Sequence, residues 1–109
     1  MRDEVDSRFL GMLGLARRAG RVIIGTELVC RAMPKRGKDS VRLVIISDKA
    51  SEATRKQLTV KSAFDGIEYI EVSIDTEELG RTLGKTYAPA AVAVTDENFA
   101  KELKRTREP

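Results

Sequence analysis

The chain has 109 residues, which is enough for one domain with a modest core. Twenty Lys and Arg against 17 Asp and Glu give a net charge of +3 at pH 7, and the hydrophobic fraction of 41% is that of a soluble globular protein. One cysteine and no histidine exclude an internal disulfide, the usual Cys/His metal sites and a His-based catalytic triad. We therefore expect no enzyme, no metal and no cofactor.

The first half of the chain predicts two helices and two strands. Asp6 or Ser7 is expected to cap a first helix that ends at Gly20. Val22–Ile24 is predicted as a short strand. Gly25 and Thr26 then open a second helix, which Pro34 and Gly37 bring to an end. The apolar run within 41–47 predicts a strand at the centre of the sheet.

The second half predicts three helices and two strands. Its expected elements are a helix begun by Asp48 or Ser51 and ending at Phe64, a strand over 67–74, a short helix capped by Asp75 and ending near Gly84, a loop over 85–89, a strand over 90–95, and a helix capped by Asp96 with a frayed tail over 104–109. This alternation predicts one α/β domain over residues 1–109, a three-layer α/β/α sandwich with a small four-stranded mixed sheet.

The positive charge is concentrated between Arg17 and Arg42. This segment holds eight Lys or Arg against two acids, Glu27 and Asp39, whereas residues 43–78 carry a net charge of −4. A basic segment beside glycine turns and a helix start suits the phosphates of RNA. Chance clustering on a solvated surface is the alternative.

The first candidate site is the start of the second helix. Gly25 allows close backbone approach, Thr26 can cap the helix or bond a phosphate or ribose, and Glu27 can accept from a guanine N–H. Arg31, four residues further on, is predicted to meet a phosphate. In the structural alternative Thr26 is only an N-cap and Glu27–Arg31 only an ion pair within the helix. The segment lacks the Walker and dinucleotide-binding patterns.

The second candidate is the loop Lys85-Thr86-Tyr87, which offers a cation and a ring for stacking on an unpaired base. Tyr87 packed on the sheet is the alternative. Lys35 adds a cation of little sequence selectivity, and Lys49 follows the central strand at the edge where α/β proteins often bind ligands. Cys30 is predicted to be a packed side chain rather than a nucleophile.

The order of several motifs resembles a known family. The motifs are Leu15-Ala16-Arg17-Arg18-Ala19-Gly20, Gly25-Thr26-Glu27, Leu43-Val44-Ile45-Ile46-Ser47-Asp48, Glu78-Leu79-Gly80-Arg81, Gly84 and Ala91-Val92-Ala93-Val94. Together they resemble the L-seven-Ae/L-thirty-e superfamily of ribosomal and kink-turn RNA-binding proteins, and within it the bacterial YlxQ-like branch. The resemblance implies a three-layer sandwich, RNA as partner and no catalysis.

This chain departs from that family at two places. The family's helix motif Gly-x-Asn-Glu-x-x-Lys holds sheared G·A pairs. Here Glu27 stands at the Asn position, Leu28 at the Glu position and Arg31 at the Lys position. Lys85 stands where the family usually places an apolar residue against an extruded base. Because Asn bonds base edges, its loss should cost specificity.

The sequence therefore predicts a cytoplasmic, monomeric, non-enzymatic RNA-binding protein associated with the ribosome. Its partners are expected to be ribosomal or kink-turn-like RNA and ribosomal proteins, with no membrane, since no apolar run approaches the length of a span. A protein-interaction module that lost kink-turn binding is the alternative, with an exposed Leu28 as its anchor. An enzyme is disfavoured because no His and no suitably spaced acid pair is present.

Overall fold

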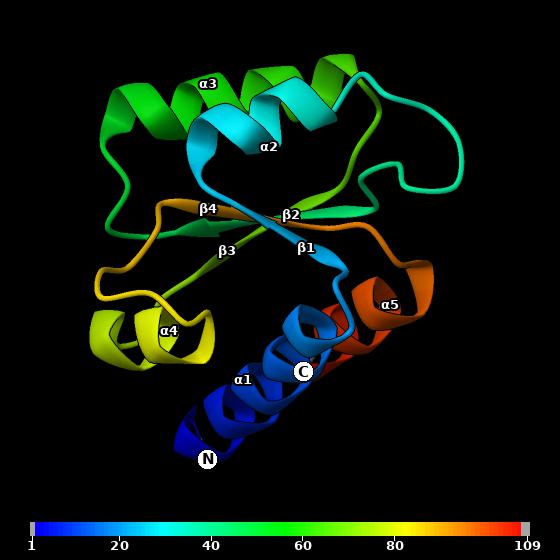
Figure 1. Cartoon of the computed structure of the whole chain (residues 1–109). Coiled ribbons are helices and arrows are strands. Elements are labelled where there is room, and N and C mark those ends of the chain that lie inside the picture. Colours follow the sequence, from blue (N-terminus) through cyan, green and yellow to red (C-terminus); the bar gives the residue numbers. More distant parts are fainter. Residues whose placement is uncertain (1, 108–109) are drawn as a thin grey trace.

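The structure, a computed structural model, describes residues 2–107 and the side chains of residues 6–107. Five helices and four strands follow one another along this part of the chain (Figure 1). They are α1 (Arg2–Arg18), β1 (Val22–Ile24), α2 (Thr26–Ala32), β2 (Leu43–Ser47), α3 (Glu52–Phe64), β3 (Tyr69–Val72), α4 (Thr76–Thr82), β4 (Ala91–Val94) and α5 (Glu97–Thr106). No helix among the described residues has the length and apolar character needed to cross a bilayer.

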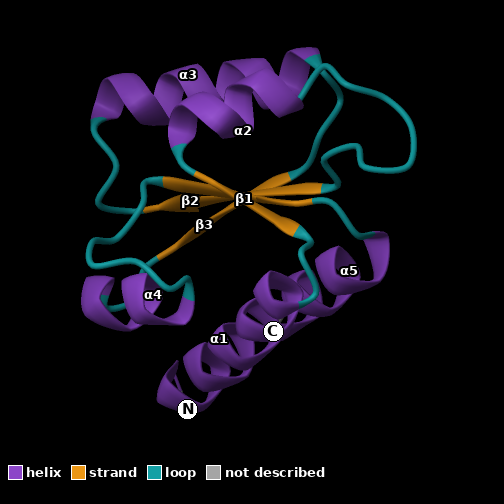
Figure 2. Cartoon of the chain, in the orientation of Figure 1, coloured by secondary structure: helices purple, strands orange, loops and turns teal. Residues whose placement is uncertain are grey.

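The four strands form one mixed sheet in the order β1-β4-β2-β3. Strand β4 is antiparallel to both β1 and β2, whereas β2 and β3 are parallel. Consequently β1, β2 and β3 run in one direction and β4 runs in the other. Helices α2 and α3 cover one face of this sheet, and α1, α4 and α5 cover the other (Figure 2). The predicted α/β sandwich with a small mixed sheet is confirmed.

The core consists of two clusters, one on each face of the sheet. Along β2, Leu43 and Ile45 belong to the cluster beneath α1, α4 and α5, whereas Val44 and Ile46 belong to the cluster beneath α2 and α3. Every residue of β2 and β4 is buried, because helices cover both faces of these central strands. The continuous apolar run in the sequence correctly predicted this central position.

Three of the predicted helix starts are confirmed by side-chain caps. Ser51 accepts a hydrogen bond from the backbone N–H of Thr54, Asp75 accepts from Glu77 and Glu78, and Asp96 accepts from Phe99. The strands are shorter at their ends than predicted, since pairing in β2 starts at Leu43 and in β3 at Tyr69.

The two terminal predictions need correction. Helix α1 starts at Arg2, so neither Asp6 nor Ser7 is its cap. Instead an Asp6 carboxylate oxygen lies 2.9 Å from a guanidinium nitrogen of Arg107. That guanidinium also lies 5.4 Å from the centroid of the Phe9 ring. With α5 helical through Thr106 and Arg107 held on α1, the fraying predicted from Lys104 is not observed through Arg107. Residues 108 and 109 lie outside the described part.

Candidate nucleic-acid interface

Four connecting segments meet at one end of the sheet, because β1, β2 and β3 finish where β4 begins. We call this region the α2 end; it comprises the first turn of α2, the turn between β2 and α3, the turn between β3 and α4, and the loop between α4 and β4. The N–H of Gly25 donates to the Ala91 carbonyl at 2.9 Å, and that of Ser47 donates to the Ala90 carbonyl at 2.9 Å. The backbone of β4 thus joins the predicted site residues of distant sequence segments. This is the carboxyl edge at which α/β sheets often bind ligands.

Helix α2 begins differently from α3, α4 and α5. Its N-cap is Gly25, with φ of 107°, a conformation that L side chains rarely adopt. No side chain caps the first N–H groups of α2, whereas Ser51, Asp75 and Asp96 cap the other three. The suggestion that Thr26 is the N-cap is therefore wrong, since Thr26 is the first helical residue. The first turn of α2 retains backbone donors for an external acceptor.

Glu27 and Arg31 form an ion pair on the outer face of α2. A guanidinium nitrogen of Arg31 lies 2.7 Å from a carboxylate oxygen of Glu27, and both side chains are largely exposed. This is the pairing that the structural alternative predicted. Because a solvent-exposed pair of this kind contributes little to stability, either partner is available to a ligand at small cost.

The loop of Lys85, Thr86 and Tyr87 folds back over the last turn of α4. Its N–H at Lys85 donates to the Gly80 carbonyl at 2.8 Å. A Cβ atom added at Gly80 would lie 2.8 Å from the Tyr87 carbonyl oxygen, so only glycine permits this approach. Tyr87 is 61% exposed and is not packed on the sheet as the alternative proposed. A shallow pocket of about 310 Å³ is lined by this loop and by residues of α4.

Arg17 supports the same loop from α1. Its Nε donates to the Thr82 carbonyl at 3.2 Å, at the end of α4 where backbone carbonyls lack helical partners. Its guanidinium also lies against Gly84, within 3.3 Å of where a Cβ would stand. In the sequence Gly80 and Arg17 stand out only as parts of motifs. Their positioning contacts could not be predicted, because both contacts join segments far apart in the chain.

Lys49 is exposed in the turn between β2 and α3, beside the half-buried Asp48. One carboxylate oxygen of Asp48, Oδ1, is buried and accepts no hydrogen bond from the described residues. A buried acceptor without a donor is uncommon in folded proteins. The turn therefore presents one exposed cation at the α2 end, whereas this Asp48 oxygen is closed to solvent.

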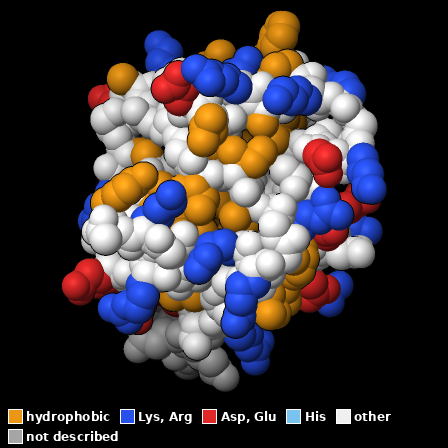
Figure 3. Space-filling view, viewed as in Figure 1, with side chains coloured by type: hydrophobic (Ala, Val, Ile, Leu, Met, Phe, Trp, Pro, Cys, Tyr) orange, Lys and Arg blue, Asp and Glu red, His pale blue; other side chains and the backbone are white. Residues whose placement is uncertain are grey.

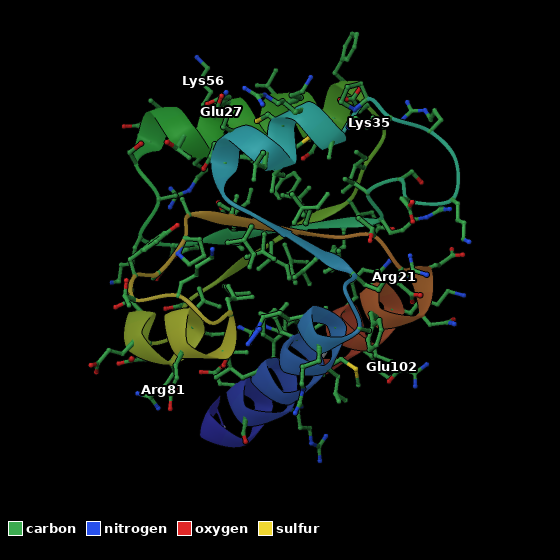
Figure 4. All side chains as sticks on the ribbon, viewed as in Figure 1. Arg21, Glu27, Lys35, Lys56, Arg81 and Glu102 are labelled. Carbon is green, nitrogen blue, oxygen red and sulfur yellow. The ribbon has the colours of Figure 1, made fainter. Side chains whose placement is uncertain are left out.

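Lys35 does not lie at the α2 end. Helix α2 carries the chain across the sheet, so Glu27 and Lys35 appear at opposite ends of it in Figure 4. Arg21 lies on the same side as Lys35, whereas Arg81 lies on the side of Glu27. The cations of the basic segment 17–42 therefore do not all lie beside the start of α2.

The charge of the α2 end follows from this separation. Its four connecting segments carry two cations and three acids, namely Lys49 and Lys85 against Glu27, Asp48 and Asp75. The sequence predicts a basic start of α2, and the structure corrects this prediction, because acids outnumber cations at the α2 end. Lys and Arg side chains are frequent on the right-hand side of the space-filling view, where the loop after α2 lies (Figure 3).

Cys30 is partly buried and packs against the cluster beneath α2 and α3. Burial raises the pKa of its thiol above the ordinary value, and the nearby positive charge of Lys61 opposes this only in part. A thiol that stays protonated is a poor nucleophile. Within the described residues, no three His, Cys, Asp or Glu side chains are grouped so as to hold a metal ion.

Comparison with known proteins identifies the family. Residues 7–104 match the ribosomal protein L7Ae/L30e/S12e/Gadd45 family, and the chain belongs to this family. Two bacterial relatives support the predicted YlxQ-like branch. RNA-binding protein YlxQ of Bacillus subtilis is 37% identical over 92 residues, which cover 84% of this chain and 87% of the relative. RNA-binding protein YlxQ of Enterococcus faecium is 30% identical over 96 residues, covering 87% and 86%.

Two solved structures share the fold. A Bacillus halodurans protein described as having unknown function superposes with a TM-score of 0.79 at 33% identity, covering 91% of this chain and 95% of its own. The 15.5kD RNA binding protein of Giardia lamblia superposes with a TM-score of 0.72 at 16% identity, covering 94% and 84%. The second similarity concerns the fold alone.

Proposed function

We propose that this protein binds structured RNA through the α2 end, as a cytoplasmic, monomeric and non-enzymatic component associated with the ribosome. The family and the relatives named RNA-binding proteins support RNA as the ligand. The observation that carries the proposal is the meeting of the uncapped start of α2, the Lys49 turn and the exposed Tyr87 loop at one end of the sheet. These groups match the phosphates and the bases of RNA.

Each group has a defined role in the proposal. The N–H groups of the first turn of α2 donate to phosphate oxygens, and Lys49 and Lys85 add charge. The Tyr87 ring stacks on an unpaired base. Glu27, which stands where the family has Asn, accepts from a guanine N–H and gives up its pair with Arg31, whose cation then meets a phosphate.

The RNA in this proposal is ribosomal or kink-turn-like, because a folded RNA with an extruded base supplies both a free ring face and a free base edge. The test titrates the whole chain against a kink-turn RNA and an unkinked duplex of equal length, at two salt concentrations. A preference for the kinked RNA at both salt concentrations is the expected result. Equal binding to the two RNAs would refute recognition of an unpaired base at the α2 end.

A protein-interaction function is the second candidate, and one observation favours it. Leu28 follows Glu27 on α2 and is 53% exposed, although it is a large apolar side chain. In this alternative, the exposed Leu28 contacts another protein, such as a ribosomal protein. Failure of both RNAs to bind in the titration would favour this candidate over RNA binding.

A further inference from the structure

The loop between α2 and β2, residues 33–42, is the most basic connection in the described part of the chain. We call it the basic loop. It carries four cations and one acid, namely Lys35, Arg36, Lys38 and Arg42 against Asp39. It lies at the end of the sheet opposite the α2 end, because α2 crosses the sheet before the loop begins (Figure 1).

Two side chains of the basic loop, those of Asp39 and Arg36, hold it in place. Asp39 accepts from a guanidinium nitrogen of Arg21 at 3.1 Å, which fixes the loop to the turn before β1. The Arg36 guanidinium donates to the carbonyls of Met33 at 3.3 Å and Asp65 at 3.4 Å, which fixes it to the end of α3. The one acid of the loop is thereby neutralised by a cation from outside it.

The remaining cations of the loop have no partner in the described structure. Lys35, Lys38 and Arg42 are exposed, and none of them forms an ion pair or side-chain hydrogen bond with residues 6–107. Arg36 bonds only to backbone carbonyls, so its charge is also uncompensated. An anchored loop that displays uncompensated cations favours binding of a polyanion.

An exposed aromatic ring stands beside this loop. Phe64 ends α3 and is 86% exposed, and the carbonyl of the next residue, Asp65, is the one that Arg36 contacts. The chain contains only three Phe and two Tyr. A large apolar ring exposed to water does not contribute to the core, and its place beside a basic loop indicates an interaction surface. Cations combined with an open ring face are typical of surfaces that bind single-stranded nucleic acid.

We infer that the basic loop and Phe64 form a second RNA contact, which binds a single-stranded segment through its phosphates and stacks one of its bases. Lys35, Lys38 and Arg42 meet the phosphates, and the Phe64 ring meets the base. This inference rests on the proposed function in taking RNA as the ligand. The inference goes beyond the proposed function because the two surfaces lie at opposite ends of the sheet. One protein therefore joins two RNA segments.

A ten-nucleotide single-stranded RNA is the probe for this surface, and its affinity for the full chain is measured by fluorescence anisotropy at several salt concentrations. Phe64→Ala should weaken binding about tenfold, since one stacked base is lost. Lys35→Gln with Lys38→Gln should reduce the salt slope by about 1.4, which corresponds to two phosphate contacts on a single strand. Both sites are exposed, so neither variant should change the thermal midpoint of unfolding.

Matched controls separate stacking and local charge from general effects. Val60→Ala removes exposed apolar surface from the same helix, and Arg81→Gln with Arg105→Gln removes the same net charge elsewhere. Both controls should bind the probe like the unaltered chain. If they weaken binding as much as the test variants, or if an acidic peptide of equal charge competes as well as RNA, the inference is overturned.

The kink-turn titration shows whether a negative result concerns only the second RNA contact at the basic loop or also the proposed function of the α2 end. If kink-turn RNA binds and the probe is insensitive to Phe64→Ala and to the Lys35/Lys38 variant, the second contact alone is wrong. Probe binding that depends on Phe64 without kink-turn recognition would overturn the α2 end and support the basic loop. If neither RNA binds, both assignments are wrong.

Discussion

The two ends of the sheet offer RNA different chemistry. At the α2 end, backbone donors and the Tyr87 ring are combined with two cations and three acids. The basic loop has four cations, one neutralised acid and the Phe64 ring beside it. Specificity derives from placed donors and acceptors, whereas affinity without sequence preference derives from charge. The comparison assigns recognition to the α2 end and electrostatic attachment to the basic loop.

Gly80→Ala should have the largest effect, because its Cβ would lie 2.8 Å from the Tyr87 carbonyl. Overpacking of this kind costs about 1–3 kcal/mol of stability and displaces the Lys85–Tyr87 loop. Kink-turn RNA binding should weaken by more than tenfold, with little change at the basic loop. Gly11→Ala is the matched control, since nothing lies within 4 Å of its added methyl group. Equal losses in the two variants would show that the loop contact is irrelevant.

Tyr87→Ala should weaken kink-turn RNA binding by about 1–3 kcal/mol, the contribution of one stacked base. The single-stranded probe of the basic loop should bind unchanged. Phe64→Ala should show the reverse pattern. Isothermal titration of both variants with both RNAs checks the assignment, and a variant that affects the two RNAs equally contradicts the separation of the two surfaces.

Glu27→Gln should weaken kink-turn RNA binding about two- to threefold. The change replaces the charged acceptor of a guanine N–H with a neutral amide oxygen, and this loss exceeds the gain from freeing the Arg31 cation, which now lies 2.7 Å from the carboxylate. The control is Glu102→Gln, which removes an acid paired with Arg105 at 3.2 Å on α5. Affinities measured at low and high salt check the prediction. Stronger binding of Glu27→Gln would contradict the role of the carboxylate as a base acceptor.

Cys30→Ser should have the smallest effect, which concerns the pH dependence of folding stability rather than RNA binding. Because burial raises the pKa of its thiol in the folded protein, folding favours the protonated form. The contribution of this thiol to folding stability is fully present below the pKa of the unfolded thiol. It is lost as the pH rises through the higher pKa of the folded thiol. Denaturant unfolding between pH 7 and 10 should show a stability loss above about pH 8.5 that Cys30→Ser lacks. A pH profile shared by both proteins would contradict this.

The sequence predicted the elements well because their signals are local. The caps at Asp75 and Asp96 and the apolar run of β2 depend on neighbouring residues, and each was found. The strand order could not be predicted, because the pairing of β4 with β1 and β2 joins segments far apart in the chain. The start of α1 was missed because Asp6 resembles a cap but pairs with Arg107.

The candidate site was only partly predictable for the same reason. Gly25, Thr26, Glu27, Lys49 and the Lys85–Tyr87 loop do meet at one end, as parallel strands require. Lys35 was grouped with them because it lies only ten residues from Gly25 in the sequence. The seven residues of α2 carry the chain across the sheet, so closeness in sequence became separation in space. A run of basic residues therefore predicts the class of partner, here RNA, better than it predicts which residues contact that partner.

The most direct test of RNA recognition at the α2 end is to follow the backbone amide resonances of the whole chain during titration with kink-turn RNA. Shifts are expected in residues 25–28, at Lys49 and in residues 85–87, where the RNA is proposed to bind. Residues 33–42 should shift only when a single-stranded RNA is added. Shifts confined to residues 33–42 during the kink-turn titration would contradict the assignment of recognition to the α2 end.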